Sequence, residues 1–234
     1  MGNSMILKAF FLTLGQIGDP RFRRVLMLGI VLTLLLLIAA TTGFVWLVGW
    51  ATGDIAMLNS MSWMQDVLSW GSVIIMLILS VFLMVPVASA ITSMFLEEVA
   101  KAVEDKHYPN LPPAETVPFS DALRDTVNFL GVLILANALA FVLYISLPIA
   151  NLMIFWGLNG FLLGREYFTL AATRRIGRTK ATQMRKQHQG VIWLAGVLMA
   201  MPLTVPVLNL VVPILGAATF THLFHLLLAK SSRV

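Results

Sequence analysis

VLMLGIVLTLLLLIAATTGFVWLVGWATG, the stretch from Val25 to Gly53, holds 29 residues without one charged side chain. About 20 helical residues cross the hydrocarbon core of a bilayer, so this stretch is long enough for one transmembrane helix. Such a helix is apolar on every side, which suits lipid or a fully buried position and not a water-exposed surface. The stretch therefore predicts an integral membrane protein.

The composition of the whole chain points the same way. Hydrophobic residues make up 59% of it and charged residues 12%, against about 45–50% and about 25% in soluble domains. The chain has no cysteine, which excludes disulfides, thiol catalysis and Cys-ligated zinc. We expect a single membrane domain, 1–234, with no cofactor, no metal and no nucleic-acid partner.

Three more uncharged stretches follow the first, at residues 67–96, 126–164 and 189–229. The first of them predicts a second span. The other two hold 39 and 41 residues, and a helix of 39 residues is about 58 Å long, about twice the hydrocarbon thickness. Prolines interrupt both of these longer stretches, at Pro148, Pro202, Pro206 and Pro213. We therefore predict two helical hairpins.

The tips of the two hairpins carry Asn151 and Asn209. If the hairpins enter from the cytoplasm, the positive end of each second arm lies deep in the membrane beside its asparagine and attracts an anion weakly, as conduction requires. Alternatively, the asparagines cap helices and satisfy freed backbone groups. The arm before Pro202 has about a dozen apolar residues, roughly 18 Å of helix, so we expect it to enter the membrane without crossing it.

The predicted fold class is an all-α integral membrane protein with two long transmembrane helices, two proline-broken, hemi-penetrating helical hairpins and an N-terminal interfacial helix. In chain order we expect an interfacial helix (4–18), a spanning helix (20–53) and a second spanning helix with a cytoplasmic extension (67–107). A first broken hairpin (120–176), a basic loop facing lipid headgroups (177–190) and a second broken hairpin (191–229) follow. If the first two spans form a hairpin, every basic residue falls on one side. The positive-inside rule makes that side the cytoplasm and places both termini there.

The segment from Gly18 to Arg24, Gly-Asp-Pro-Arg-Phe-Arg-Arg, immediately precedes the first span. Asp19 suits an N-cap and Pro20 the first helical position, so a helix should begin here. Its free backbone N–H groups and dipole favour an anion. Three side chains add fixed charge and forked donors: Arg21, Arg23 and Arg24. The segment predicts an oxyanion site at the membrane surface; alternatively, these arginines only anchor the span and set its topology.

No Asp, Glu, Lys or Arg interrupts any of the four uncharged stretches. Proton-coupled carriers usually need an ionisable group inside the membrane, so this absence favours passive permeation. His222 and His225, three residues apart, share a helix face and could hold a metal, but no third ligand lies nearby in the sequence and a structural role is favoured.

Small residues from Gly157 to Gly164 predict close packing against a neighbouring helix. They lead into Arg165 and Glu166, an adjacent charged pair at the cytoplasmic interface. This interfacial pair could gate a pathway, pair with another helix or bind lipid headgroups.

Four motifs spread along the chain carry a family resemblance: Phe22-Arg-Arg24, Glu98-Val-Ala-Lys-Ala-Val-Glu-Asp-Lys-His-Tyr-Pro109, Asn159-Gly-Phe-Leu-Leu-Gly-Arg-Glu-Tyr-Phe168 and Pro206-Val-Leu-Asn-Leu-Val-Val-Pro213. With them the chain resembles the CysZ-like family of bacterial inner-membrane proteins, which also includes the etoposide-induced proteins of eukaryotes. The resemblance implies sulfate uptake for cysteine synthesis, the hairpin fold described above, a homo-oligomer and a sulfate site at the paired arginines, here Arg23 and Arg24. One departure is that the sulfate-permease members carry an aspartate- and tyrosine-rich stretch where this chain has Gly164-Arg-Glu-Tyr-Phe-Thr-Leu170.

The leading hypothesis is therefore a multi-pass sulfate channel or permease of the bacterial inner membrane, with sulfate and the lipid bilayer as its partners. The alternative is a non-transporting membrane scaffold or assembly factor. An enzyme is not expected, because no nucleophile with its base and no metal triad can be assembled from these residues.

Overall fold

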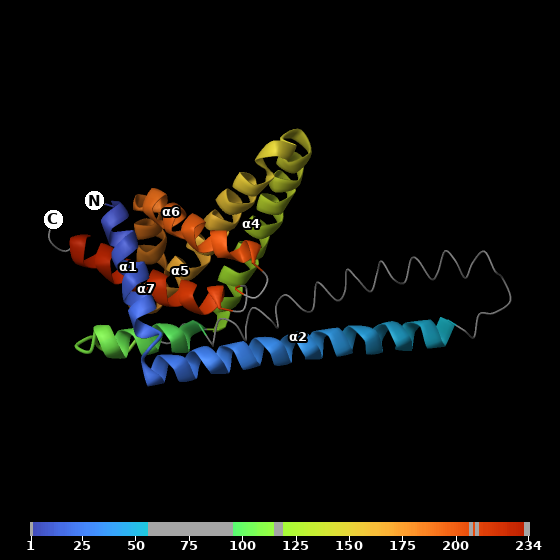
Figure 1. The fold of residues 1–234 in the computed structure, drawn as a ribbon, viewed down its shortest axis with the longest axis horizontal. Coiled ribbons are helices and arrows are strands. Elements are labelled where there is room, and N and C mark those ends of the chain that lie inside the picture. The colour runs from blue at the N-terminus through green and yellow to red at the C-terminus, as the bar shows by residue number, and fades with distance from the viewer. Residues whose placement is uncertain (1, 56–95, 115–118, 206–207, 209–210, 232–234) are drawn as a thin grey trace. The chain divides into compact units, whose positions relative to one another are not determined.

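The computed structural model describes residues 2–55, 96–114, 119–205, 208 and 211–231. Every regular element within these ranges is a helix (Figure 1). The chain divides into two compact units, Ile30–Thr92 and a larger unit made of Met1–Gly29 and Ser93–Val234. The single membrane domain remains a prediction.

Two helices open the chain, α1 (Gly2–Gln16) and α2 (Pro20–Ile55). The 36 residues of α2 make a helix of about 54 Å. Its start follows from the local sequence, because the carboxylate of Asp19 accepts hydrogen bonds from the backbone N–H groups of Arg21 at 3.0 Å and Phe22 at 3.1 Å. The expected N-cap at Asp19 is thus confirmed.

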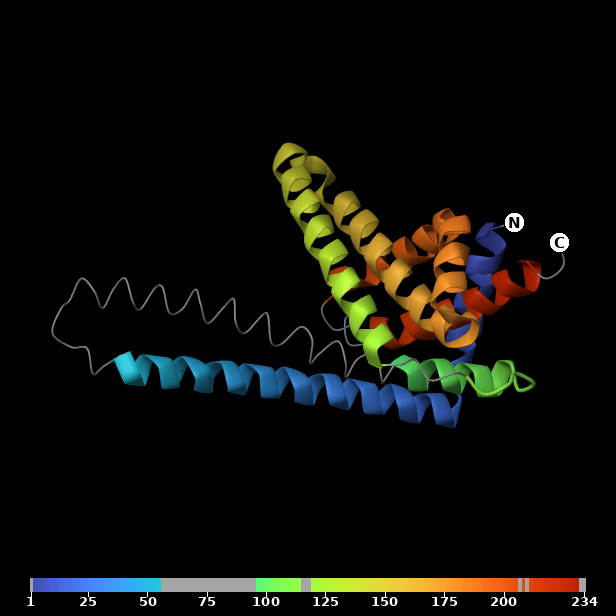
Figure 2. The same cartoon turned by 180° about the vertical axis from the view of Figure 1, so that it is seen from behind.

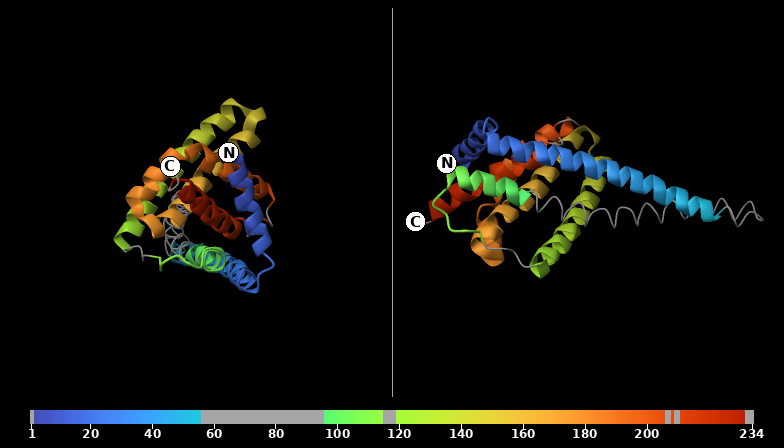
Figure 3. Two further views of the ribbon diagram at one scale, coloured as in Figure 1. Left: turned by 90° about the vertical axis from the view of Figure 1, so that its left-hand side faces the viewer. Right: turned by 90° about the horizontal axis from the view of Figure 1, so that it is seen from below.

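Helix α7 (Val212–Ser231) forms the core of the larger unit, with α1 and α5 (Asn151–Gln187) packed against it (Figure 3). Residues 216–225 of α7 are all buried. Phe168 of α5 meets Phe224 edge to face, with ring centroids 6.1 Å apart. A hydrogen bond of 3.2 Å between the hydroxyls of Thr219 and Thr13 joins α7 to α1.

The first proline break has the expected place. Helix α4 (Phe119–Ser146) ends just before the short 3₁₀ turn η2 (Pro148–Ala150), and α5 then runs back beside α4 (Figures 1 and 2). In the second half of the chain, α6 (Gln189–Ala200) has 12 residues and is followed by the 3₁₀ turn η3 (Met201–Thr204) and α7. Whether either pair of helices stops partway through a membrane remains a prediction.

Helices α5 and α6 approach each other through glycine. A Cβ atom added at Gly196 of α6 would lie 2.0 Å from the carbonyl oxygen of Gly160. One added at Gly164 would lie 2.7 Å from the carbonyl oxygen of Ile192. No larger residue fits at this spacing, so the small residues of α5 serve the close helix packing that the sequence predicts.

In the part of the chain that the structure describes, two helices are long and apolar enough to cross a bilayer, Val127–Ser146 and Val212–Ser231. The first is only 6% buried within the protein and the second 72% buried. The first therefore offers most of its apolar surface to the surroundings, while the second serves the core. Ser4–Gln16 is a shorter apolar helix, and its place at the membrane surface remains a prediction.

One expectation for the polar segments is wrong. Residues 177–190 do not form a loop, because α5 continues to Gln187 and α6 begins at Gln189. The lysines, arginines, alanines and glutamines after Gly177 are strong helix formers, so their polarity does not end the helix. Only Gly177 interrupts it, with a φ of 73° that glycine adopts without strain.

Residues 96–107 are expected as a cytoplasmic extension of the second predicted span. This segment is helical, and Val99, Ala100 and Val103 on it are completely buried. It is amphipathic, and it packs by its apolar stripe. The rest of the predicted second helix, from residue 67 to residue 95, lies outside the described residues.

Candidate oxyanion site

The start of α2 differs from the sequence expectation in one respect. Pro20 has no N–H, Asp19 accepts from the N–H groups of Arg21 and Phe22, and the backbone oxygen of Asp19 accepts from Arg23 at 2.8 Å. The first turn therefore has no free N–H group to offer an external anion. The expectation that these groups bind an anion is wrong, because the chain supplies its own carboxylate.

Two ion pairs join this turn to the helical segment 96–107. Arg21 lies 2.7 Å from Asp105, and Lys106 lies 2.8 Å from Asp19. The hydrogen bond from Lys106, followed by the backbone N–H of Phe22, lowers the pKa of Asp19. The Arg21–Asp105 pair is 63% and 41% exposed, and exposed pairs contribute at most about 1 kcal/mol each. We call residues 18–24 the arginine turn. The two ion pairs orient this turn more than they stabilise the fold.

Arg23 and Arg24 remain as the accessible cations of the turn. Both are exposed, and neither side chain pairs with an acidic group among the residues that the structure describes. Phe22 between Arg21 and Arg23 is completely buried, which fixes the turn against the larger unit. Gly18 is exposed, and no atom lies within 4 Å of where its Cβ would be. Gly18, Arg23 and Arg24 are thus all exposed, while Arg21 is held in an ion pair.

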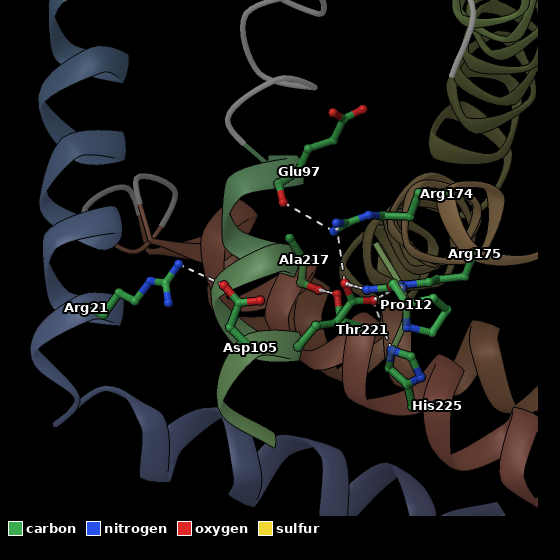
Figure 4. A network of polar contacts seen from close by, with 10 residues as sticks. Arg21, Glu97, Asp105, Pro112, Arg174, Arg175, Ala217, Thr221 and His225 are labelled. Carbon is green, nitrogen blue, oxygen red and sulfur yellow. Dashed lines mark hydrogen bonds and ion pairs between the residues drawn. The ribbon is translucent and has the colours of Figure 1, made fainter. Parts of the chain in front are cut away.

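A buried charge network lies on the opposite side of segment 96–107 from Arg21 (Figure 4). Glu104, 2% exposed, accepts from Nε of Arg175 at 2.9 Å and lies 3.3 Å from Arg174. The Oε1 atom that accepts from Arg175 also lies 3.0 Å from Nε2 of His225. Each arginine also donates from Nη1 to a backbone carbonyl. Arg174 donates to the carbonyl of Glu97, and Arg175 donates to that of Pro112.

The network strongly lowers the pKa of its carboxyl group. Burial alone raises the pKa of Glu104, but the hydrogen bonds from His225 and Arg175 and the charges of Arg174 and Arg175 outweigh it and lower the pKa to about 2. Glu104 is therefore ionised at all physiological pH values. Sequence reasoning missed it, although Glu104 follows buried Val99, Ala100 and Val103 at helical spacing, a signal that it faces inward.

The histidines of α7 belong to the same region. Tyr108 stacks on His225 with ring centroids 4.2 Å apart, and its hydroxyl lies 3.2 Å from Nδ1 of His222. Burial, followed by the charge of Glu104, raises the pKa of Tyr108 to about 12. Across the described residues, no group of three or more His, Asp or Glu side chains is placed to hold a metal ion.

The remaining sequence candidates lie elsewhere. Asn151 is exposed at the start of α5, where the N-cap position is Ala150 and no side chain caps the helix, so the suggested capping role of Asn151 at this end is wrong. Asn209 lies outside the described residues. Arg165 lines a cavity between α5 and α6, while Glu166, its neighbour, is half-buried.

Within the described residues, two helices long and apolar enough to cross a bilayer and two exposed arginines at the start of α2 are features of a membrane protein. A family model described as Sulfate transporter CysZ/Etoposide-induced protein 2.4 matches residues 9–213. The chain belongs to this family, which confirms the resemblance drawn from its motifs. The matched range includes the arginine turn and Glu104 and ends before His222 and His225. No curated protein matches the chain.

Proposed function

We propose that this protein is a passive sulfate channel or permease of the bacterial inner membrane, supplying sulfur for cysteine synthesis. One observation carries the proposal: a member of the sulfate transporter family holds two exposed arginines, Arg23 and Arg24, at the start of a long apolar helix. Their forked guanidinium groups match the oxygens of a tetrahedral oxyanion.

The charge balance around the turn supports anion recognition. Four basic side chains gather there against two carboxylates, which leaves a formal excess of two positive charges: Arg21, Arg23, Arg24 and Lys106 against Asp19 and Asp105. The charges of Arg21 and Lys106 are neutralised by their ion pairs with Asp105 and Asp19. The excess therefore resides on Arg23 and Arg24, and it would balance the two negative charges of one sulfate ion.

The apolar helices support passive flow. Residues 127–146 of α4 include no charged side chain, so nothing in this apolar part of the helix would load a proton or trap an anion. Sulfate entering against 100 mV costs about 4.6 kcal/mol for two charges, equivalent to a gradient of about 2,000-fold. Net uptake then depends on rapid consumption of sulfate inside the cell. We place both termini and the arginine turn in the cytoplasm, with Asn151 and Asn209 at the hairpin tips, and we propose a homo-oligomer.

A non-transporting membrane scaffold is the second candidate. The family description also names etoposide-induced proteins, and α4 presents an apolar surface of which only 6% is buried within the protein. Such a surface suits lipid or a membrane partner as well as it suits a channel.

Flux through liposomes separates the two. Purified protein reconstituted into liposomes should release or take up radiolabelled sulfate well above empty liposomes. The absence of such flux over several lipid compositions and pH values, together with a stoichiometric membrane partner that co-purifies, would establish the scaffold instead.

A further inference from the structure

A cavity of about 140 Å³ lies between α5 and α6, outside the arginine turn of α2. Three of its lining side chains are basic, Arg165, Arg185 and Lys186, and no lining residue is acidic. A cavity needs about 10–15 Å³ to hold one water molecule, and this cavity has about ten times that volume. A tetrahedral oxyanion, with five heavy atoms, therefore fits. Arg185 donates to the hydroxyl of Thr169 at 3.4 Å.

The other wall of the cavity is aromatic and faces outward. Phe161 and Trp193 are 47% and 46% exposed. The indole N–H of Trp193 donates to the carbonyl oxygen of Gly157 at 2.9 Å, which holds the ring in place. Tryptophan is enriched where hydrocarbon gives way to headgroups.

The lining of the cavity therefore has two kinds of chemistry. It is basic at one end, and at the other end it is apolar and exposed through Phe161 and Trp193. A free inorganic anion would use only the basic end, whereas a phospholipid would use both.

We propose that this cavity binds the phosphate group of an anionic phospholipid, with the acyl chains along Trp193 and Phe161. Helix α6 begins beside the cavity, and no side chain caps it at His188, so its positive end adds to the attraction of the three cations. Arg165 could gate a pathway, pair with another helix or bind a headgroup, and its place in this cavity favours headgroup binding. This lipid site is independent of sulfate conduction at α2.

The test uses the full chain, purified in detergent and mixed with equal amounts of phosphatidylglycerol and phosphatidylcholine, with retained lipid measured by native mass spectrometry. The wild type should retain phosphatidylglycerol preferentially. In the double variant Arg185→Gln with Lys186→Gln the preference should fall about ten- to thirty-fold, since each basic residue near an anionic surface contributes about five-fold. The matched control Lys101→Gln with Lys180→Gln removes two exposed cations that do not line the cavity and should leave the preference unchanged.

Two further arms separate charge from folding and lipid from free ion. Arg185→Lys with Lys186→Arg should restore the preference. Trp193→Ala, which keeps all three cations, should reduce retention of both lipids. Unchanged retention in the Gln double variant or in Trp193→Ala overturns the lipid site. So does displacement of phosphatidylglycerol by millimolar inorganic phosphate or sulfate that itself binds, because the cavity then serves a free oxyanion.

Discussion

The carboxylate of Glu104 lies 3.0 Å from the imidazole Nε2 of His225, which joins two segments 121 residues apart in the sequence. Both side chains are buried, at 3% and 5% exposure. A buried carboxylate costs several kcal/mol to desolvate, and it persists here because Arg174 and Arg175 also surround it. The network therefore holds segment 96–107, α5 and α7 together in one arrangement.

Removing the charge of Glu104 should be strongly destabilising. Glu104→Gln leaves the guanidinium groups of Arg174 and Arg175 buried beside a neutral amide, and breaking a buried pair in this way costs about 3–5 kcal/mol. Thermal unfolding of the purified protein in detergent measures the loss. Glu98→Gln is the control, since Glu98 is exposed on the same helix, and it should change stability by less than about 0.5 kcal/mol. Equal melting temperatures for the two variants would contradict the network's role.

The same carboxylate predicts a pH dependence. The pKa of Glu104 is about 2 in the folded protein against an ordinary 4.5, so the folded state favours the ionised form. Its contribution is complete above about pH 4.5 and is lost as pH falls from there towards 2. The full loss is about 3 kcal/mol, from about 1.4 kcal/mol for each pKa unit. Acid unfolding of wild type should be steeper in this window than that of Glu104→Gln, and parallel curves would refute the assignment.

The glycine contact between α5 and α6 gives a test of packing. A methyl group at Gly196 would lie 2.0 Å from the carbonyl oxygen of Gly160, so Gly196→Ala must push the helices apart and should cost about 2 kcal/mol or more. Gly190, in the first turn of α6, has no atom within 4 Å of its Cβ position. Gly190→Ala should therefore be neutral or stabilising by up to about 1 kcal/mol, because alanine is the better helix former. Chemical denaturation of both variants decides whether the two substitutions separate as expected.

Local features of this fold could be predicted from the sequence, and distant ones could not. The start of α2 depends on Asp19 and Pro20 alone, and the break after α4 depends on Pro148, so each is visible in a short window. Glu104 meets partners 71 and 121 residues away, and no local pattern encodes such a pairing. The charge of the basic segment after Gly177 favours an exposed loop, whereas its residue types favour the helix that the structure shows. The cavity that Arg165 lines could not be predicted for the same reason, since its walls come from residues that are distant in the sequence.

Asp19 should affect stability and anion binding in opposite directions. Asp19→Ala removes the N-cap of α2 and the partner of Lys106, which should cost about 1 kcal/mol. The same change frees two backbone N–H groups and deletes a negative charge beside Arg23 and Arg24, so sulfate should bind more tightly. Sulfate-dependent stabilisation in a thermal shift series measures both effects. A variant that loses stability without gaining sulfate affinity would separate the arginine turn from anion recognition.

Replacing Arg23 and Arg24 together by glutamine tests the proposed channel most directly. Each charged hydrogen bond to an oxyanion contributes about 1.5–3 kcal/mol, so sulfate flux at subsaturating concentration should fall at least ten-fold. Added neutral salt should shrink the difference between wild type and variant, because exposed charges are screened over about 8 Å at 0.15 M.

Two controls make that measurement specific. Lys8→Gln with Lys101→Gln removes the same amount of charge from exposed positions on α1 and segment 96–107 and should leave the flux unchanged, so net charge alone cannot produce the effect. Arg21→Gln breaks the ion pair with Asp105 but leaves both accessible cations, and it should reduce flux only two- to three-fold through misplacement of the turn. If Arg21→Gln and the Arg23/Arg24 variant reduce flux equally, the turn acts as a structural anchor and sulfate is recognised elsewhere in the molecule.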